Sequence, residues 1–107
     1  MADRLSVARD YVAKKPADRF GLYTLAMELR KVQAWEECFA TFDRLLELYP
    51  ENGPGYYHYA KAKQESDDLA GARVLIERGI ASTTKSGDGK TLAELKDLKL
   101  GLESLED

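Results

Sequence analysis

The chain repeats its apolar pattern with a period of 34 residues. Pro16 and Pro50 are separated by this interval, and so are apolar residues that follow each of them. The pairs are Leu22 with Tyr56, Leu25 with Tyr59, Ala26 with Ala60, Cys38 with Ala72, Phe42 with Ile76 and Leu46 with Ile80. Such a period is typical of proteins built from a repeated supersecondary unit, in which each unit buries its apolar face by stacking on the next.

Within each repeat, the apolar residues are spaced by three and four positions, which predicts α-helices and leaves no credible strand. Asp18 is a good N-cap, and Pro54 suits the first turn of a helix. Because the connections are short, neighbouring helices should be antiparallel. We expect about six helices: near 3–15, from 19, 35–49, from 53, from after Ser66 or Asp67, and 90–105.

The residue types at the repeated positions follow a fixed order. The first repeat has Leu22, Leu25, Ala26, Leu29, Cys38, Phe42, Leu45 and Pro50, and the second has Tyr56, Tyr59, Ala60, Ala72, Ile76 and Gly79. This order resembles the tetratricopeptide repeat (TPR) family, in which large, small and aromatic residues alternate in this way and Pro ends the repeat. The second repeat departs from the pattern at Lys63 and Thr84, which replace Leu29 and Pro50.

The resemblance implies an all-α fold, a right-handed superhelical array of antiparallel helix pairs of the TPR-like α-solenoid type. We expect a single domain with an N-terminal cap helix at 1–16, repeats at 19–52 and 53–87, and a C-terminal cap helix at 90–105. In the first helix, the residues expected to face inward are Leu5, Ala8, Tyr11 and Val12. Cys38 occupies a small-residue position and is expected to be a buried structural thiol.

A second stripe of residues is displaced from the core face on the first helix of each repeat. Its members are Phe20, Tyr23, Met27 and Arg30 in one repeat, and Pro54, Tyr57, Lys61 and Gln64 in the other. In the TPR family these positions line a concave groove that holds a partner peptide. The resemblance therefore implies a non-catalytic adaptor that binds a protein or peptide partner. Alternatively, the stripe packs on the neighbouring repeat or on the final helix.

Two cations of the stripe, Arg30 and Lys61, favour an acidic partner or a free C-terminal carboxylate. Some TPR proteins clamp such a carboxylate with an Asn and several cations. Met27 and Lys61 occupy the matching key positions and neither position holds an Asn, so that particular ligand is not expected.

The final helix carries more leucine than one buried face needs. Leu95, Leu98, Leu102 and Leu105 share one face, and Leu92, Ala93 and Leu100 form a second patch. The second patch suggests self-association through Leu92 and Leu100. The alternative function is therefore a homodimeric scaffold whose groove is filled by its own C-terminal helix.

Composition argues against several classes of function. A net charge of -3 disfavours broad nucleic-acid binding. One Cys and one His allow no internal disulfide, make a zinc site improbable and leave too few groups for a His-based triad, so we expect no metal, no cofactor and no enzyme activity. No apolar run is long enough to span a membrane, and no signal-peptide pattern occurs, which favours the cytoplasm.

The segment 83–91 ends in Gly89-Lys90-Thr91, the ending of a phosphate-binding loop. Thr84 stands where that motif requires its first Gly, and no strand precedes it, so nucleotide binding is not expected. The segment is predicted instead to be a long flexible connection, after which Thr91 and Glu94 form a capping box for the final helix.

Overall fold

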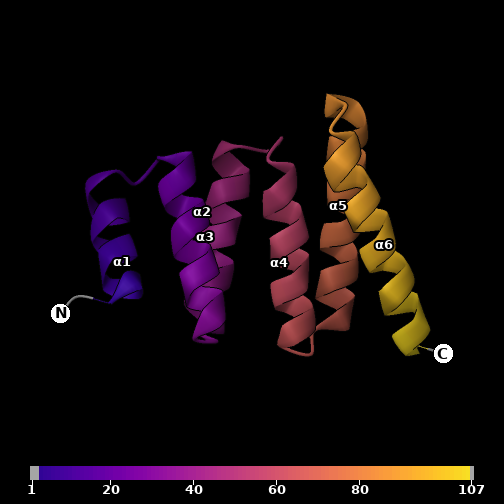
Figure 1. The fold of residues 1–107 in the computed structure, drawn as a ribbon, viewed down its shortest axis with the longest axis horizontal. Helices are drawn as coiled ribbons and strands as arrows, with labels where there is room; N and C mark the ends of the chain where they lie inside the picture. The colour runs from indigo at the N-terminus through magenta and orange to yellow at the C-terminus, as the bar shows by residue number, and fades with distance from the viewer. Residues whose placement is uncertain (1–2, 107) are drawn as a thin grey trace. The chain divides into compact units, whose positions relative to one another are not determined.

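The structure, a computed structural model, describes residues 3–106, and this range folds into six α-helices with no strand (Figure 1). Their bounds are α1 Arg4–Lys14, α2 Arg19–Lys31, α3 Trp35–Leu48, α4 Gly53–Glu65, α5 Leu69–Ser86 and α6 Gly89–Glu106. The prediction of an all-helical repeat fold is confirmed. The chain divides into two compact units, Met1–Pro50 and Glu51–Asp107. The assignment of both to a single domain stays a prediction.

Five helices begin with the same cap. The side chains of Asp3, Asp18, Asn52, Asp68 and Asp88 each accept a hydrogen bond from the backbone N–H three residues on, at 2.7, 2.8, 3.0, 2.8 and 3.1 Å. Such caps satisfy one of the N–H groups that a helix leaves unpaired at its start. The prediction for Asp18 is confirmed, whereas the fifth helix starts after Asp68 and not after Ser66 or Asp67.

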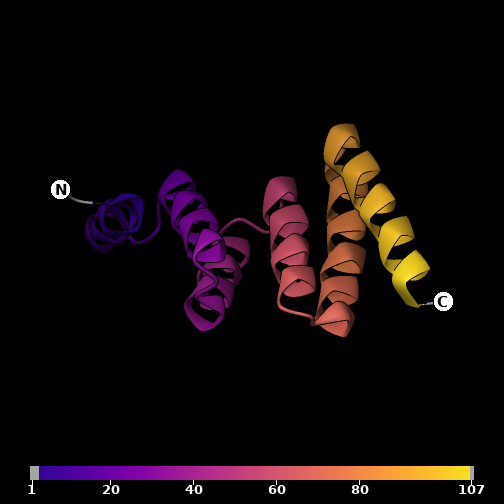
Figure 2. The same ribbon diagram turned by 60° about the horizontal axis from the view of Figure 1, so that its bottom comes forward.

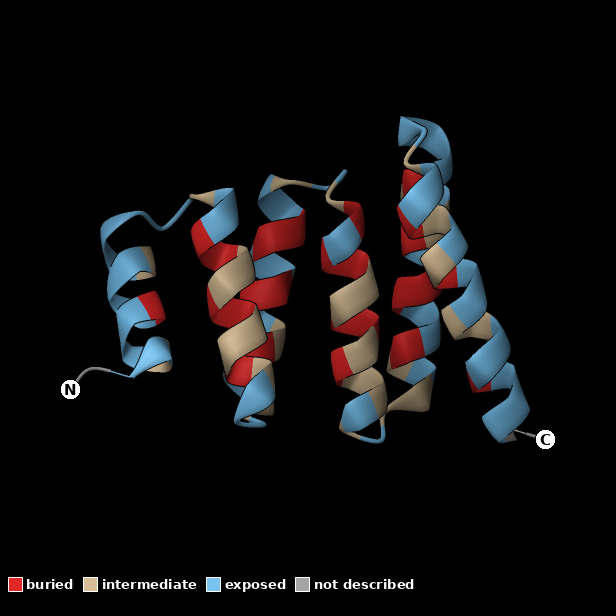
Figure 3. Cartoon of the chain, in the orientation of Figure 1, coloured by how far each residue is buried: buried red, intermediate tan, exposed pale blue. Residues whose placement is uncertain are grey.

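In unit Met1–Pro50, α2 packs against both α1 and α3. Its core is made by Leu22, Leu25, Ala26, Leu29, Cys38, Phe42, Leu45 and Leu46, which lie on facing sides of the helices (Figure 3). Cys38 is fully buried and its Sγ lies 3.5 Å from the carbonyl oxygen of Ala26, as expected for a structural thiol. Completely burying a side chain such as Leu29 contributes about 1.5–3 kcal/mol.

The first helix is less buried than its pattern predicts. Ala8 is buried, and Leu5 and Val12 are half-buried. Tyr11 faces α2, as predicted, but 39% of its surface stays exposed. Its ring covers Gly21 of α2, where an added Cβ would lie 2.6 Å from the ring atoms.

In unit Glu51–Asp107, α4 packs against both α5 and α6. The three helices lie side by side in both views, with α6 running back along α5 (Figure 2). Gly79 of α5 is buried at the point where the other two helices meet it. A Cβ there would lie 2.7 Å from Cβ of Tyr56 and 2.8 Å from Cδ1 of Leu95, so glycine permits the close approach of all three helices.

The connection before α6 differs from the prediction. Helix α5 continues through Ser86, and only Gly87 and Asp88 separate it from α6, so there is no long loop. Gly87 takes a left-handed conformation with φ 80°, and the N–H groups of Gly87 and Asp88 both bond to the carbonyl of Thr83 at 3.0 Å. The cap of α6 is Asp88, so the predicted capping box at Thr91 is wrong.

Candidate interaction surfaces

The predicted stripe on α2 lies at the surface of its unit. Phe20 is 74% exposed, and Tyr23, Met27 and Arg30 are half-buried. Aromatic and Arg side chains are common anchors of protein interfaces. The local structure therefore suits binding, since these residues are not consumed by the core of their own unit.

The corresponding stripe on α4 is half-buried at Tyr57, Lys61 and Gln64, and Pro54 is exposed. The rings of Tyr57 and His58 meet edge to face, with centroids 5.1 Å apart. Lys61 forms no ion pair with any residue in the range 3–106. Oε1 of Gln64 is buried and has no hydrogen-bond partner in that range. A buried acceptor without a donor is costly, and a bound N–H group would satisfy it.

The two stripes belong to different compact units. Whether Phe20, Tyr23, Met27, Arg30, Tyr57, Lys61 and Gln64 form one continuous groove stays a prediction. What the structure gives is the state of each stripe in its own unit: partly exposed aromatic residues and a cation on the same face of an equivalent helix.

The leucines of α6 divide differently from their predicted faces. Leu95 and Leu102 are buried and Leu98 is half-buried, as expected for residues facing α5 and α4. The prediction for Leu105 is wrong, because it is 62% exposed. In the second patch, Leu92 is half-buried and Leu100 is 63% exposed. Their role in self-association stays a prediction.

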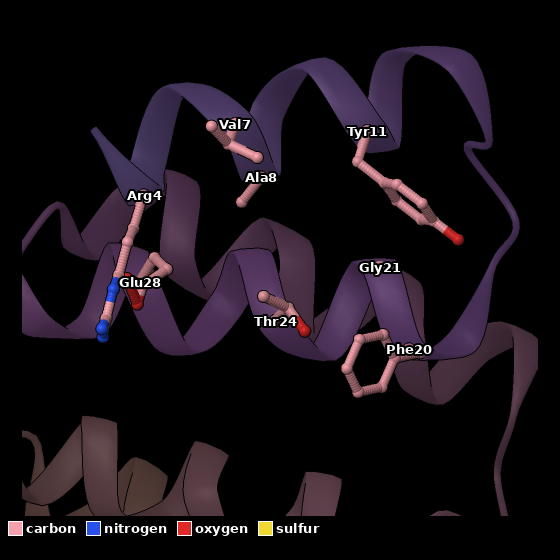
Figure 4. A pocket seen from close by; sticks show the side chains of 8 residues that line it. All are labelled: Arg4, Val7, Ala8, Tyr11, Phe20, Gly21, Thr24 and Glu28. Atoms are coloured by element: carbon pink, nitrogen blue, oxygen red, sulfur yellow. The ribbon is translucent and has the colours of Figure 1, made fainter. Parts of the chain in front are cut away.

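A groove between α1 and α2 was not predicted. Its volume is about 460 Å³, and α1 contributes Arg4, Val7, Ala8 and Tyr11 to its wall. From α2 it is lined by Phe20, Gly21, Thr24 and Glu28 (Figure 4). Val7 is 55% exposed, so an aliphatic side chain faces open space there. The 34-residue period could have indicated this groove, because it makes α1 equivalent to α5, a helix that its neighbours cover more completely.

A two-point ion pair joins α1 to α3. Nε and Nη2 of Arg9 donate to the Glu37 carboxylate on α3 at 3.1 and 2.7 Å. These hydrogen bonds lower the pKa of Glu37. Because both side chains are nearly half exposed, solvent screens the pair, so it contributes little to stability.

Neither a metal centre nor a membrane span is found in the described part of the chain. No group of three or more His, Cys, Asp or Glu side chains among residues 3–106 is placed to hold a metal ion. In the same range, no helix is long and apolar enough to cross a bilayer.

The chain is similar to solved helical-repeat structures. The solution structure of a tetratricopeptide repeat domain protein from Salinibacter ruber has 35% identity and a TM-score of 0.77, with 85% of this chain and 92% of that chain covered. A crystal structure of the tetratricopeptide repeat domain protein from the same organism has 34% identity and a TM-score of 0.73, with 82% and 99% covered.

A third structure shares the fold at lower sequence similarity. The solution structure of a Bordetella parapertussis protein has a TM-score of 0.85 at 20% identity, and covers 99% of this chain and 92% of that chain. A scan against protein-family models and a search of curated proteins gave no match.

Proposed function

Because the chain belongs to the tetratricopeptide repeat family, we propose that it is a non-catalytic interaction module that binds a peptide or protein segment on the stripes of α2 and α4. Helical repeats of this family generally serve protein–protein interaction. The observation that carries the proposal is the equivalent placement of Tyr23 and Tyr57. Both are half-buried on the second face of a capped helix, 34 residues apart.

Charge and hydrogen-bonding capacity favour an acidic ligand. Lys61 has no ion-pair partner among the described residues, and Arg30 lies on α2 at the position that the 34-residue period matches with Gln64. Gln64 adds an unsatisfied buried acceptor one turn along α4 from Lys61. An acidic peptide would place carboxylates against the cations and a backbone N–H against Gln64. A free C-terminal carboxylate is the most compact ligand of this kind.

The test is binding to a library of acidic peptides, each made with a free carboxylate and as the C-terminal amide. Fluorescence anisotropy should find peptides that bind wild type and lose most of their affinity for the triple variant Tyr23→Ala, Tyr57→Ala, Lys61→Ala. Circular dichroism would verify that the variant is folded. Unchanged affinity in a folded triple variant would refute the stripes as the binding surface.

Self-association through α6 is a second candidate, favoured by the 63% exposure of Leu100 beside half-buried Leu92. A homodimeric scaffold would place these leucines at the interface. Sedimentation equilibrium over a concentration series tests this, with Leu100→Lys as the disrupting variant. A strict monomer at about 1 mM would eliminate a dimer of any useful affinity.

A further inference from the structure

The groove between α1 and α2 corresponds to a site that is occupied elsewhere in the chain. Twice the 34-residue period relates Arg4, Val7, Ala8 and Tyr11 of α1 to Ala72, Leu75, Ile76 and Gly79 of α5. All four residues of α5 are buried. The four residues of α1 line the groove instead, and of these only Ala8 is buried.

The second wall of the groove has a counterpart as well. Helices α2 and α6 begin with the same cap, Asp18 bonding to Gly21 and Asp88 to Thr91. When the two helices are aligned on their caps, Gly21 of the groove matches Thr91, which is buried. The pair α1 and α2 is therefore equivalent to the pair α5 and α6.

In the second unit, α4 packs into the groove between α5 and α6. Helix α4 contacts both α5 and α6, and Cβ of Tyr56 lies beside Gly79. A short connection reverses the chain between α4 and α5, and another does so between α5 and α6. Helix α4 therefore runs antiparallel to α5 and parallel to α6 (Figure 1). In the first unit, no described element takes the equivalent place, and Val7 and Phe20 remain 55% and 74% exposed. The groove thus has the form of a site for one more helix.

The charges around the groove favour an acidic helix. Residues 3–31 contain seven Lys and Arg but four Asp and Glu, whereas the whole chain has 16 and 19. Arg4 lines one end of the groove and forms no ion pair within residues 3–106 (Figure 4). At the other end, Nζ of Lys15 lies 5.6 Å from the centre of the Tyr11 ring.

The acidic groups near the groove already have partners. Glu28 is paired with Lys31 at 3.0 Å. The Asp18 carboxylate accepts hydrogen bonds from the N–H of Gly21 and the hydroxyl of Tyr11. The charge left for a ligand is therefore that of Arg4 and Lys15.

A second copy supplying its own α6 fits the site poorly. Suppose that α6 of a second copy packed against α1 in the groove. The residue of α6 that corresponds to Ala26 and Ala60 would then have to lie in close contact with α1. Ala26 and Ala60 have no exposed surface, but α6 carries exposed Lys96 at that level. A long charged side chain there opposes the close approach that alanine allows.

We propose that the groove between α1 and α2 binds an acidic amphipathic helix of another protein, in the position that α4 takes against α5 and α6. This surface is separate from the ligand stripes of the proposed function, although Phe20 borders both. By analogy with α4, the bound helix runs parallel to α2. The first turn of the bound helix then lies near Lys15. Acidic residues in that turn would attract Lys15 and would also stabilise the dipole of the bound helix. Because Tyr11 replaces Gly79, the bound helix has a small residue where α4 has Tyr56.

The probe is a synthetic peptide of residues 51–66 with Tyr56→Ala and Tyr57→Glu, held helical by a lactam bridge in which the new carboxyl at position 57 condenses with the amine of Lys61. The bridge is needed because so short a helix is marginal in water. An acidic version carries Asn52→Asp and Lys63→Glu, and a basic version carries Glu51→Lys and Asn52→Lys. Both are fluorescently labelled and titrated with the full chain.

The protein variants are chosen at exposed positions, so that they leave the fold intact. Val7→Asn removes an apolar contact in the groove, and Val74→Asn is the control, since Val74 is the same residue type at similar exposure (58% against 55% for Val7) but lies outside the groove. Arg4→Gln removes the groove cation. We expect the acidic peptide to bind wild type and Val74→Asn equally. Val7→Asn should weaken it about tenfold, a usual loss for an interface contact, and Arg4→Gln should reduce its preference over the basic peptide, the remainder being due to Lys15.

Three results would overturn the proposal. The first is no binding of the acidic peptide at about 1 mM protein. The second is an equal loss of affinity for the acidic peptide in Val7→Asn and Val74→Asn. The third is a wild-type dimer in sedimentation experiments that Val7→Asn dissociates, which would assign the groove to a second copy. Binding that persists in the triple variant Tyr23→Ala, Tyr57→Ala, Lys61→Ala separates this site from the proposed function.

Discussion

Replacing Gly79 by alanine should destabilise the protein, although alanine is the better helix former. Gly79 lies in the middle of α5 and is buried against both α4 and α6. The new Cβ would lie 2.7 Å from Cβ of Tyr56 and 2.8 Å from Cδ1 of Leu95. The Tyr56 atom is tied directly to the α4 backbone, so the contact is relieved only if a helix moves.

Two opposing effects set the magnitude. Alanine in place of glycine stabilises a helix interior by about 0.5–1 kcal/mol. An extra carbon in a packed core costs about 1–3 kcal/mol, because side chains and backbone must shift. The contact with a backbone-anchored atom places Gly79 toward the upper part of that range, so we expect a net loss of roughly 1–2 kcal/mol in the free energy of unfolding.

The matched control is Gly101→Ala in α6. A Cβ at Gly101 meets nothing within 4 Å, and the residue is exposed. Only the helix-propensity gain remains there, so the variant should be more stable by about 0.5–1 kcal/mol. Urea unfolding followed by far-UV circular dichroism measures both, and an unchanged slope with urea verifies that the unfolding reaction is the same. If Gly79→Ala is as stable as wild type, the packing argument for α4, α5 and α6 is wrong.

Three further predictions concern individual side chains. Asp88→Ala should lower the melting temperature by a few degrees, unlike the exposed control Asp97→Ala. Hydrogen bonds from Thr91 lower the pKa of Asp88 in the folded protein. The stabilisation by Asp88 is therefore present above about pH 4 and is lost as the pH falls. The Arg9 and Glu37 pair should show weak coupling in a double-mutant cycle of glutamine variants, and none at high salt. Buried Cys38 should react with a thiol reagent only when the protein unfolds, and rapid labelling of the native protein would contradict its burial.

Local sequence signals predicted the helices well where period and cap agree. Asp18 and Pro54 mark helix starts by their own chemistry, and the structure has α2 and α4 at those places. At α5, three polar residues in succession, Ser66, Asp67 and Asp68, each suit an N-cap. Asp67 takes a positive φ of 66° in the turn, which leaves Asp68 as the cap. Sequence alone does not distinguish such neighbours, because the turn geometry decides between them.

Residues near the end of α5 were mispredicted because tertiary contacts outweigh propensity. Thr83 and Thr84 are weak helix formers, and Gly87 and Gly89 suggest a loop. However, Thr83 is fully buried, and its hydroxyl bonds to the carbonyl of Gly79 at 2.8 Å. Its Cγ2 also lies 3.1 Å from where a Cβ of Gly53 would be, so α5 extends to cover the start of α4. The contact between Thr83 and Gly53 joins residues 30 positions apart, beyond any local pattern.

Two apolar residues are more exposed than their predicted faces implied, and the physical reason differs between them. Tyr11 of α1 and Leu105 of α6 both have the correct helical spacing for a core face, yet they are 39% and 62% exposed. Periodicity shows which face of a helix is apolar, but not whether a neighbouring helix covers it. Leu105 lies in the last turn of α6, beside the first turn of antiparallel α5, where the covering helix ends. Tyr11 instead borders a groove that another helix would fill. An exposed apolar residue beside such a groove is therefore better evidence of a binding surface than an exposed apolar residue in the last turn of a helix.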